Sequence, residues 1–311
     1  MRRIFLATWV ILMAINLNGQ YLPQVTHFMY DQIRTNPGSA GSLDMINASI
    51  IYRNQWTGFP GAPSTPIVEA EAPFKLFGVQ HGVGINLYND MLGFNSLIDF
   101  QLNYAYRITL GNGTLGIGIK GGFEQNTLKP DWHPSEANSD PNIPQSSPDK
   151  MTFTLGAGIF YRTDDIYFGA SALNINSPQV STYSQIGTAR YNLDRQFYVT
   201  AGYTMQLTNP AYEIIPSVLL KSDIVSTDAD INLTLMYNKK IWGGVTYRTG
   251  EAVAGMIGME LIEGLKIGYA YDFATSAIQK ESRGGHEVFI NYSVKLGVEK
   301  APEKYKSIRF L

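Results

Sequence analysis

Alternation of apolar and polar residues is the clearest pattern in the chain, and it is best developed over residues 96–110, SLIDFQLNYAYRITL. Phe100 and Leu102 alternate there with Asp99, Gln101 and Asn103. A period of two places the two sets on opposite faces of one strand, whereas a helix would scatter both sets around its circumference. The segment is long enough to cross a bilayer as a tilted strand, which takes about 9–11 residues.

The same alternation recurs along the chain and predicts about fourteen strands, an even number as in single-chain bacterial barrels. The predicted strands cover residues 45–53, 65–73, 81–89, 96–107, 114–123, 151–161, 166–173, 195–206, 212–222, 228–237, 241–248, 252–260, 265–272 and 286–296. This pattern predicts an all-β fold in which antiparallel strands form a transmembrane outer-membrane β-barrel over residues 45–297.

The lengths of the connections support a barrel. Counted from the first strand, the even connections are mostly short, whereas long ones at 124–150, 174–194 and 273–285 are all odd. Outer-membrane barrels have short periplasmic turns and longer external loops. We therefore expect both termini in the periplasm and the odd connections outside. The alternative is a soluble, secreted β-sandwich, whose strands are usually shorter.

Composition narrows the class further. The 311 residues are 44% hydrophobic and 16% charged, with a formal net charge of −2, which excludes a disordered chain and a general nucleic-acid binder. The 19 Tyr, 15 Phe and 30 Gly suit the aromatic girdles and tight turns of membrane barrels. Cys is absent, so no disulfide, thiolate metal site or Cys nucleophile is possible.

The ends of the chain are predicted to lie outside the barrel wall. Residues 1–19 read as a signal peptide, with Arg2 and Arg3 before an apolar run and cleavage before Gln20. The alternative, a membrane-anchoring helix, would need a longer apolar run. Residues 20–44 are predicted to pack at the periplasmic mouth or inside the lumen. Residues 298–311 are predicted to form a periplasmic tail.

No catalytic or metal-binding arrangement is evident in the sequence. The four His residues lie far apart without ligand spacing, and no G-x-S-x-G motif occurs. The G-x-G runs lie inside strands without a following helix, so they do not predict phosphate binding. We therefore expect a non-enzyme without cofactor or metal.

A set of polar residues is predicted to face the lumen. The lipid side of the wall takes the apolar positions, so the interior must be polar. These side chains are expected to satisfy one another rather than to line a transport pathway. The set comprises Glu69, Glu71, Asp99, Gln101, Asn103, Arg107 and Lys120.

Two blocks carry a resemblance to a known family: PQVTHFMYDQIRTNPGSAGS at residues 23–42 and YRNQWTGFPGAPSTP at residues 52–66. Together they resemble the PorP/SprF family of the Bacteroidota type IX secretion system. Members typically show P-Q-[FV]-[ST]-x-[YF]-M-[FY] leading into N-P-[AG]-x-A-G, then R-x-Q-W-x-G-[FI]-x-G-A-P-x-T. Gly38 stands where Ala is usual, which is a small departure.

The resemblance implies a non-enzymatic outer-membrane barrel that works with secretion machinery in the lipid of the outer membrane. Its gliding-associated branch supports secretion and surface attachment of large adhesins through their C-terminal domains. The expected partners are thus a secreted adhesin C-terminal domain and machinery components or periplasmic lipoproteins. Two alternatives stay open: an anchor for machinery components on the periplasmic side, and a porin or transporter for small solutes.

The loop of the second block is the candidate contact region. Its Gly and Pro residues predict a rigid turn that either caps the lumen or contacts cargo. Large aromatic residues commonly anchor interfaces, and another Trp lies in the loop at 124–150. The candidate residues are Arg53, Gln55, Trp56, Phe59, Pro60, Gly61, Pro63, Thr65 and Trp132.

Overall fold

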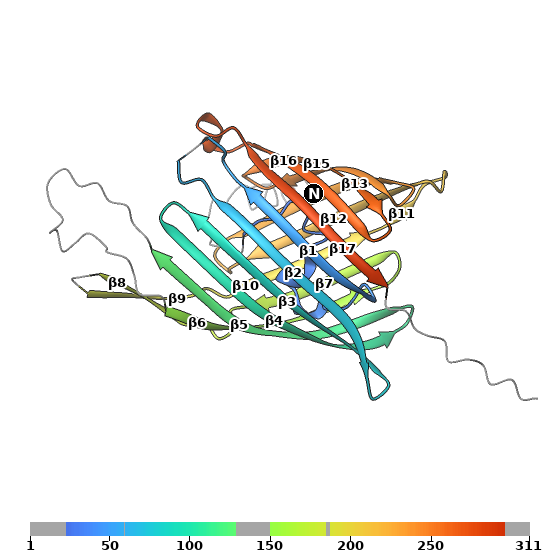
Figure 1. Ribbon diagram of the computed structural model, residues 1–311, viewed down its shortest axis with the longest axis horizontal. Helices are drawn as coiled ribbons and strands as arrows, with labels where there is room; N and C mark the ends of the chain where they lie inside the picture. Colours follow the sequence, from blue (N-terminus) through green and yellow to red (C-terminus); the bar gives the residue numbers. More distant parts are fainter. Residues whose placement is uncertain (1–22, 59, 129–149, 185–186, 296–311) are drawn as a thin grey trace, which may run out of the picture.

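A computed structural model describes residues 23–58, 60–128, 150–184 and 187–295. Fourteen antiparallel strands pair in chain order, and β10 pairs with β12 to close the wall, so the fold is a β-barrel as predicted (Figure 1). The barrel strands are β1 (Met45–Asn54), β2 (Ser64–Leu76), β3 (Val79–Leu92), β4 (Asn95–Leu110), β5 (Gly113–Leu128), β6 (Lys150–Arg162), β7 (Ile166–Leu173), β10 (Gln196–Tyr203), β12 (Tyr212–Ser222), β13 (Thr227–Tyr237), β14 (Ile241–Arg248), β15 (Ala252–Ile262), β16 (Leu265–Ala274) and β17 (Gly285–Lys295).

The wall is built with its polar face inward. In β4, Gln101 and Asn103 are 3% exposed, whereas Phe100 and Leu102 on the other face are 40% and 55% exposed. This is the reverse of a water-soluble protein and matches a wall whose outer face meets lipid. Among the described residues, no helix is both long enough and apolar enough to cross a membrane.

The two ends of the barrel differ in their connections. One end carries the connections at 55–63, 174–195 and 275–284, together with the end of β5 at Leu128 and the start of β6 at Lys150, and is called the long-loop end here. The other, the short-turn end, carries two-residue turns such as 77–78, where Phe77 and Gly78 have φ of 51° and 81°. Two successive positive φ values characterise a type I′ turn, whose twist fits a two-residue hairpin.

Between the first and last strands, the structure differs from the predicted set in three places. The hairpin of β8 (Gln179–Ser184) and β9 (Gly187–Asn192) lies in the connection between β7 and β10, and forms a separate two-stranded sheet at one side of the long-loop end (Figure 1). The predicted strand at 195–206 is interrupted at Thr204, beyond which β11 (Met205–Gln206) pairs with β12. A 3-10 turn, η2 (Ala277–Lys280), lies in the connection between β16 and β17.

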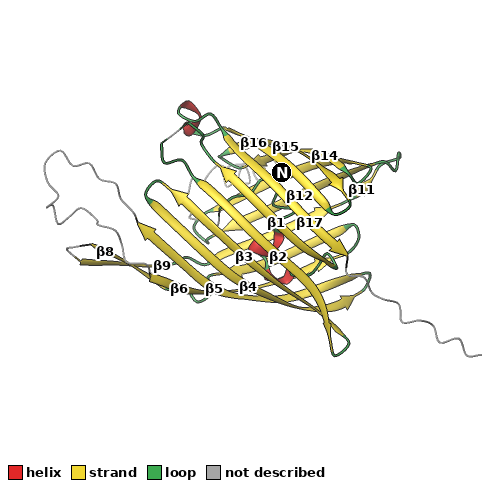
Figure 2. Cartoon of the chain, in the orientation of Figure 1, coloured by secondary structure: helices red, strands yellow, loops and turns green. Residues whose placement is uncertain are grey.

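The N-terminal segment, residues 23–44, lies inside the barrel and is called the plug here. It contains α2 (Gln32–Thr35) and η1 (Pro37–Ser39), the helical turns that Figure 2 shows enclosed by the strands. Each of the three hydrophobic clusters joins the plug to the wall: Val25 packs with Ile51 and Phe289, Phe28 with Leu173 and Tyr198, and Ile33 with Ala105. The core of the protein is therefore the contact between plug and wall.

Candidate functional site

The plug approaches the wall closely because several wall positions have no side chain. A Cβ on Gly118 would lie 2.3 Å from the backbone N of Gly38, and one on Gly116 would lie 2.0 Å from the Gly38 carbonyl oxygen. Asn36 fixes the same turn: its Nδ2 donates to the Ile159 carbonyl at 2.9 Å, and its Oδ1 accepts from the Gly38 N–H at 2.9 Å. The inward glycines of β5 and β6 therefore form the seat of η1.

Glu287 holds the start of the plug at the long-loop end. Its Oε1 accepts from the His27 N–H at 2.9 Å and its Oε2 from the Thr26 N–H at 2.7 Å. His27 Nδ1 lies 2.6 Å from Oε1 and must carry the hydrogen, because an ionised carboxylate can only accept. Glu287 is 1% exposed, so these donors replace its lost water.

An unbroken chain of ion pairs continues from Glu287 across the inner wall. Arg53 binds Glu287 at 3.0 Å and also pairs with Asp272. Arg248 lies 3.2 Å from both Asp272 and Asp230, and Lys221 lies 2.9 Å from Asp230. The six side chains come from β17, β1, β16, β14, β13 and β12, and we call them the ion ladder: Glu287, Arg53, Asp272, Arg248, Asp230 and Lys221.

The opposite part of the wall uses mainly neutral hydrogen bonds. Glu69 accepts from Asn86 Nδ2 at 2.7 Å, and the Asn86 Oδ1 accepts from Asn103 Nδ2 at 2.5 Å. Gln101 Nε2 donates at 2.8 Å to both Asp99 Oδ2 and Thr154 Oγ1.

Further residues of this part of the wall bind the plug backbone directly. Lys120 donates to the Arg34 carbonyl at 2.9 Å, and Glu71 accepts from the Gly41 N–H at 2.8 Å. Arg107 binds the Gly41 carbonyl and, at 2.7 Å, Asp44. All seven side chains that the sequence assigned to the lumen thus lie on the inner face, where most contact the plug or one another.

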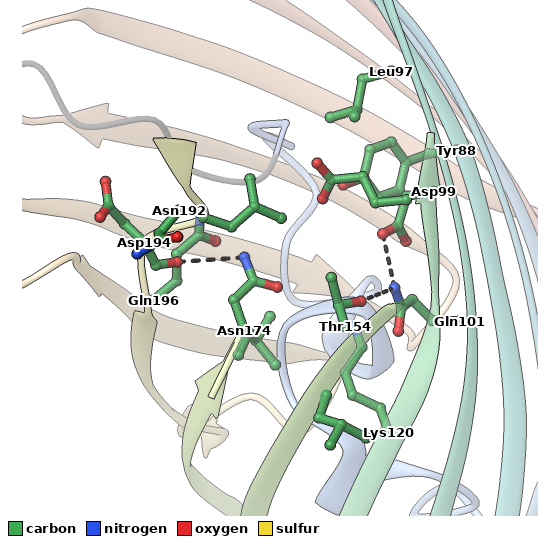
Figure 3. A pocket seen from close by; sticks show the side chains of 14 residues that line it. Tyr88, Leu97, Asp99, Gln101, Lys120, Thr154, Asn174, Asn192, Asp194 and Gln196 are labelled. Carbon is green, nitrogen blue, oxygen red and sulfur yellow. Dashed lines mark hydrogen bonds between the residues drawn. The ribbon is translucent and has the colours of Figure 1, made fainter. Parts of the chain in front are cut away.

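A cavity of about 120 Å³ lies on this side at the long-loop end. Figure 3 shows Asp99, Gln101 and Thr154 on one wall, Lys120 below them, and Asn174, Asn192 and Asp194 across the space. Glu124 and Gln196 complete its polar lining, and Tyr88, Leu97, Leu155, Leu173 and Leu193 its apolar lining. Asn192 and Asp194 are exposed at its rim. We call it the mouth cavity.

The Gly- and Pro-rich loop lies over the other side of the same end. The Gln55 N–H donates to the Pro63 carbonyl at 2.9 Å, and the Thr57 N–H donates to the Gly284 carbonyl at 2.8 Å, so the loop is tied to the connection between β16 and β17. Trp56 has a φ of 51° and, with Gln55, lines a small cavity beside Asp272. The loop therefore covers the ion ladder.

The remaining residues predicted for this loop do not lie together in one site. Pro60 and Gly61 are exposed, Pro63 is buried, and Thr65 donates to Asp90 at 2.6 Å inside the barrel. Arg53 is not a loop residue, since it lies in β1 within the ion ladder. Phe59 and Trp132 lie outside the described residues, as do the segments predicted as a signal peptide at 1–19 and as a periplasmic tail at 298–311.

The short-turn end carries a second hollow of about 400 Å³. Arg107, Arg162, Asp44 and Asp164 contribute its charged groups, and the end of the plug at Ser42 and Leu43 forms one side. In the part of the chain that the structure describes, no three His, Asp or Glu side chains are grouped so as to hold a metal ion.

Sequence reasoning missed His27, Glu287, Asp272, Arg248, Asp230 and Glu124. Alternation provided a signal for Glu287, because Val288 and Ile290 on the outer face place Glu287 and Phe289 inside. No local signal joins His27 to Glu287, since 260 positions separate them in the chain.

The comparisons with known proteins agree with this architecture. A family model described as type IX secretion system membrane protein PorP/SprF matches residues 17–292. A search of curated proteins finds no match.

Among solved structures, the CymD monoaromatic hydrocarbon channel is similar at a TM-score of 0.50 and 9% identity, over 86% of this chain and 93% of that chain. The Pseudomonas putida toluene transporter TodX has a TM-score of 0.48 and 10% identity, over 85% of this chain and 93% of its own. The Ralstonia pickettii toluene transporter TbuX has a TM-score of 0.48 and 10% identity, over 84% and 92%. Identities this low indicate likeness of fold alone.

Proposed function

Because the chain belongs to the PorP/SprF family of type IX secretion system membrane proteins, we propose that it is a non-enzymatic scaffold that binds the C-terminal domain of a secreted adhesin at the cell surface. Family and fold together place it in the outer membrane, in association with the secretion machinery. The long-loop end would face outward and carry the cargo, and the chain ends beyond the barrel would lie in the periplasm.

One observation carries this proposal: the plug occupies the middle of the lumen and is bound to the wall near both of its ends and between them. Thr26 and His27 are bound near the long-loop end, Asn36 at mid-wall, and Gly41 and Asp44 toward the short-turn end. A barrel filled in this way offers surfaces at its two ends rather than a path through its centre. The small-solute porin is therefore the weaker reading.

The long-loop end has the features that an interface needs. Its loop at 55–63 is tied down by backbone hydrogen bonds, so little ordering entropy would be lost when a partner docks. The hairpin of β8 and β9 extends the rim beside the mouth cavity, which supplies polar groups for specificity (Figure 1).

A second candidate is an anchor for machinery components or lipoproteins on the periplasmic side. The hollow at the short-turn end favours it, because two arginines and two aspartates, among them the ion pair of Arg107 with Asp44, line it beside the end of the plug. Both activities can coexist, since they would use opposite ends of the barrel.

The test is surface display of the adhesin in cells that lack this barrel. We expect the adhesin to be lost from the surface and to return when the intact gene is restored. A second complementing variant, in which Gly and Ser replace residues 57–61, tests the loop itself. It should insert normally in the outer membrane yet restore less adhesin at the surface. Unchanged adhesin at the surface of deleted cells would contradict the proposal.

A further inference from the structure

The mouth cavity contains acidic groups that form no ion pair with any described residue. Asp99 is 5% exposed, and its only hydrogen bond from the described residues comes from the neutral amide of Gln101. Glu124, half-buried on the next strand, has no hydrogen bond or ion pair to any residue that the structure describes. The third carboxylate, Asp194, lies exposed at the rim.

A buried hydrogen-bond acceptor in the same cavity also lacks a partner among the described residues. Gln101 is 3% exposed and lines the cavity, and its Oε1 has no hydrogen-bond partner among the described residues, although its Nε2 makes two bonds. A buried polar atom without a partner is destabilising, and a donor entering the cavity would supply the missing hydrogen bond. The cavity thus has two carboxylates and one amide oxygen that require donors.

The single cation of the cavity is already engaged. Lys120 donates to the Arg34 carbonyl of the plug, and it is not within ion-pair distance of Asp99 or Glu124. This differs from the ion ladder, where every carboxylate lies against an arginine or lysine. With three carboxylates against one lysine, the lining has a formal charge of −2.

We propose that the mouth cavity receives an arginine side chain from the secreted partner that docks at the long-loop end. This inference rests on the proposed function and adds the chemistry by which the partner is recognised. A volume of about 120 Å³ holds about four waters at about 30 Å³ each, a space suited to a side-chain head group rather than to a folded segment.

Arginine fits better than lysine because of its donors. A guanidinium carries five N–H donors in a rigid plane and binds carboxylates in pairs, so it can meet Asp99, Glu124 and Gln101 Oε1 together. An ammonium is a compact point charge that is more strongly hydrated and more costly to desolvate. Leu97, Leu173, Leu193 and Tyr88 would pack against the aliphatic stem.

The first experiment tests the cavity without the cargo. The purified barrel in detergent is titrated with L-arginine amide, L-lysine amide and L-citrulline amide; the last has the same α-amino group as the others but an uncharged side chain of the shape of arginine. We expect saturable binding of arginine amide, weaker binding of lysine amide and none of citrulline amide. Asp99→Asn with Glu124→Gln should weaken arginine amide at least tenfold. Equal binding of arginine and citrulline amides, or no binding of either, would overturn the inference.

The second experiment uses the adhesin C-terminal domain as ligand. The double variant should bind it at least tenfold more weakly, and Glu281→Gln, which removes an exposed carboxylate from the same end outside the cavity, should bind as the wild type does. If the wild type and the double variant bind equally well, the cavity inference is wrong and the proposed function stands. If the wild type does not bind the domain at all, the proposed function fails, and the amide titrations still decide the cavity.

Discussion

The two sides of the lumen at the long-loop end differ in how their buried carboxylates are paired. On the side of β12 to β17 and β1, each carboxylate of the ion ladder meets a cation and the loop at 55–63 covers it. On the side of β4 to β7 and β10, Asp99 and Glu124 face the mouth cavity without such partners among the described residues. The first arrangement fixes the plug, and the second leaves acidic groups ready for a ligand.

The largest effect is expected at Glu287, where the ladder meets the plug. Glu287→Ala leaves Arg53, the Thr26 and His27 amides and His27 Nδ1 without their shared acceptor, and breaking a buried ion pair in this way costs about 3–5 kcal/mol. We expect a lower urea midpoint in lipid vesicles and faster proteolysis within residues 23–44. Glu263→Gln is the control, since its pair with Lys295 is exposed. Wild-type resistance of the plug in Glu287→Ala would mean that the ladder does not hold it.

The next largest effect on stability is expected at Gly118, the position of β5 that lies against the backbone of the plug. In Gly118→Val the added carbons would overlap the backbone of Pro37 and Gly38, and overpacking of this kind costs about 1–3 kcal/mol or displaces the plug. Planar bilayers should record openings from the variant and almost none from the wild type. Gly255→Ala on the outer face, where a Cβ meets nothing within 4 Å, should stay silent. A wild-type barrel that conducts freely would contradict a plugged lumen.

A smaller loss is expected at the far end of the ladder. In Lys221→Met, Asp230 keeps Arg248 at 3.2 Å, so only one of its two cations is lost. Losing a hydrogen bond to a charged group costs about 1.5 kcal/mol, which should lower the urea midpoint less than Glu287→Ala does. A loss as large as that of Glu287→Ala would show that the ladder acts as one unit rather than through its local contact with the plug.

The smallest effect on stability is expected on the open side. Glu124→Gln removes a carboxylate that has no ion-pair partner among the described residues and that lies near Asp99 in the same cavity. Relief of repulsion should leave the free energy of unfolding unchanged or slightly higher, within about 0.5 kcal/mol. Thermal unfolding in detergent measures it, with Glu287→Ala as the positive control. A loss above this range would reveal a structural partner for Glu124.

The barrel could be predicted from the sequence because every strand of a membrane-spanning wall alternates inward polar residues with outward apolar ones. Buried and exposed positions alternate over residues 98–108 of β4 and 116–120 of β5, and the parity of the long connections locates the two ends. All fourteen strands were placed in this way. The hairpin of β8 and β9 was not predicted, because it belongs to a connection and carries no membrane-facing alternation.

The site was harder to predict because its contacts join distant parts of the chain. Alternation puts Asp99, Arg107 and Lys120 on the inner face, where the structure also has them, but it does not tell which of them has a counter-charge. The ion ladder depends on the relative heights of six strands, and the bond from Thr26 to Glu287 spans 261 positions. The plug itself lacks periodicity, so only its buried packing in the lumen reveals how its residues are used.

The contact between Thr26 and Glu287 also bears on the order in which the protein assembles. The plug is the earliest part of the described chain to be synthesised, whereas its acceptors, Asp272 and Glu287, belong to the last two strands. The plug therefore cannot reach its final bonds until the last hairpin is in place, and closing so long a loop is slow. A barrel that lacks these strands would leave Thr26 and His27 without their acceptors, while Gly41 and Asp44 could still bind β2 and β4, so the start of the plug would stay open to proteases until the last strands are in place.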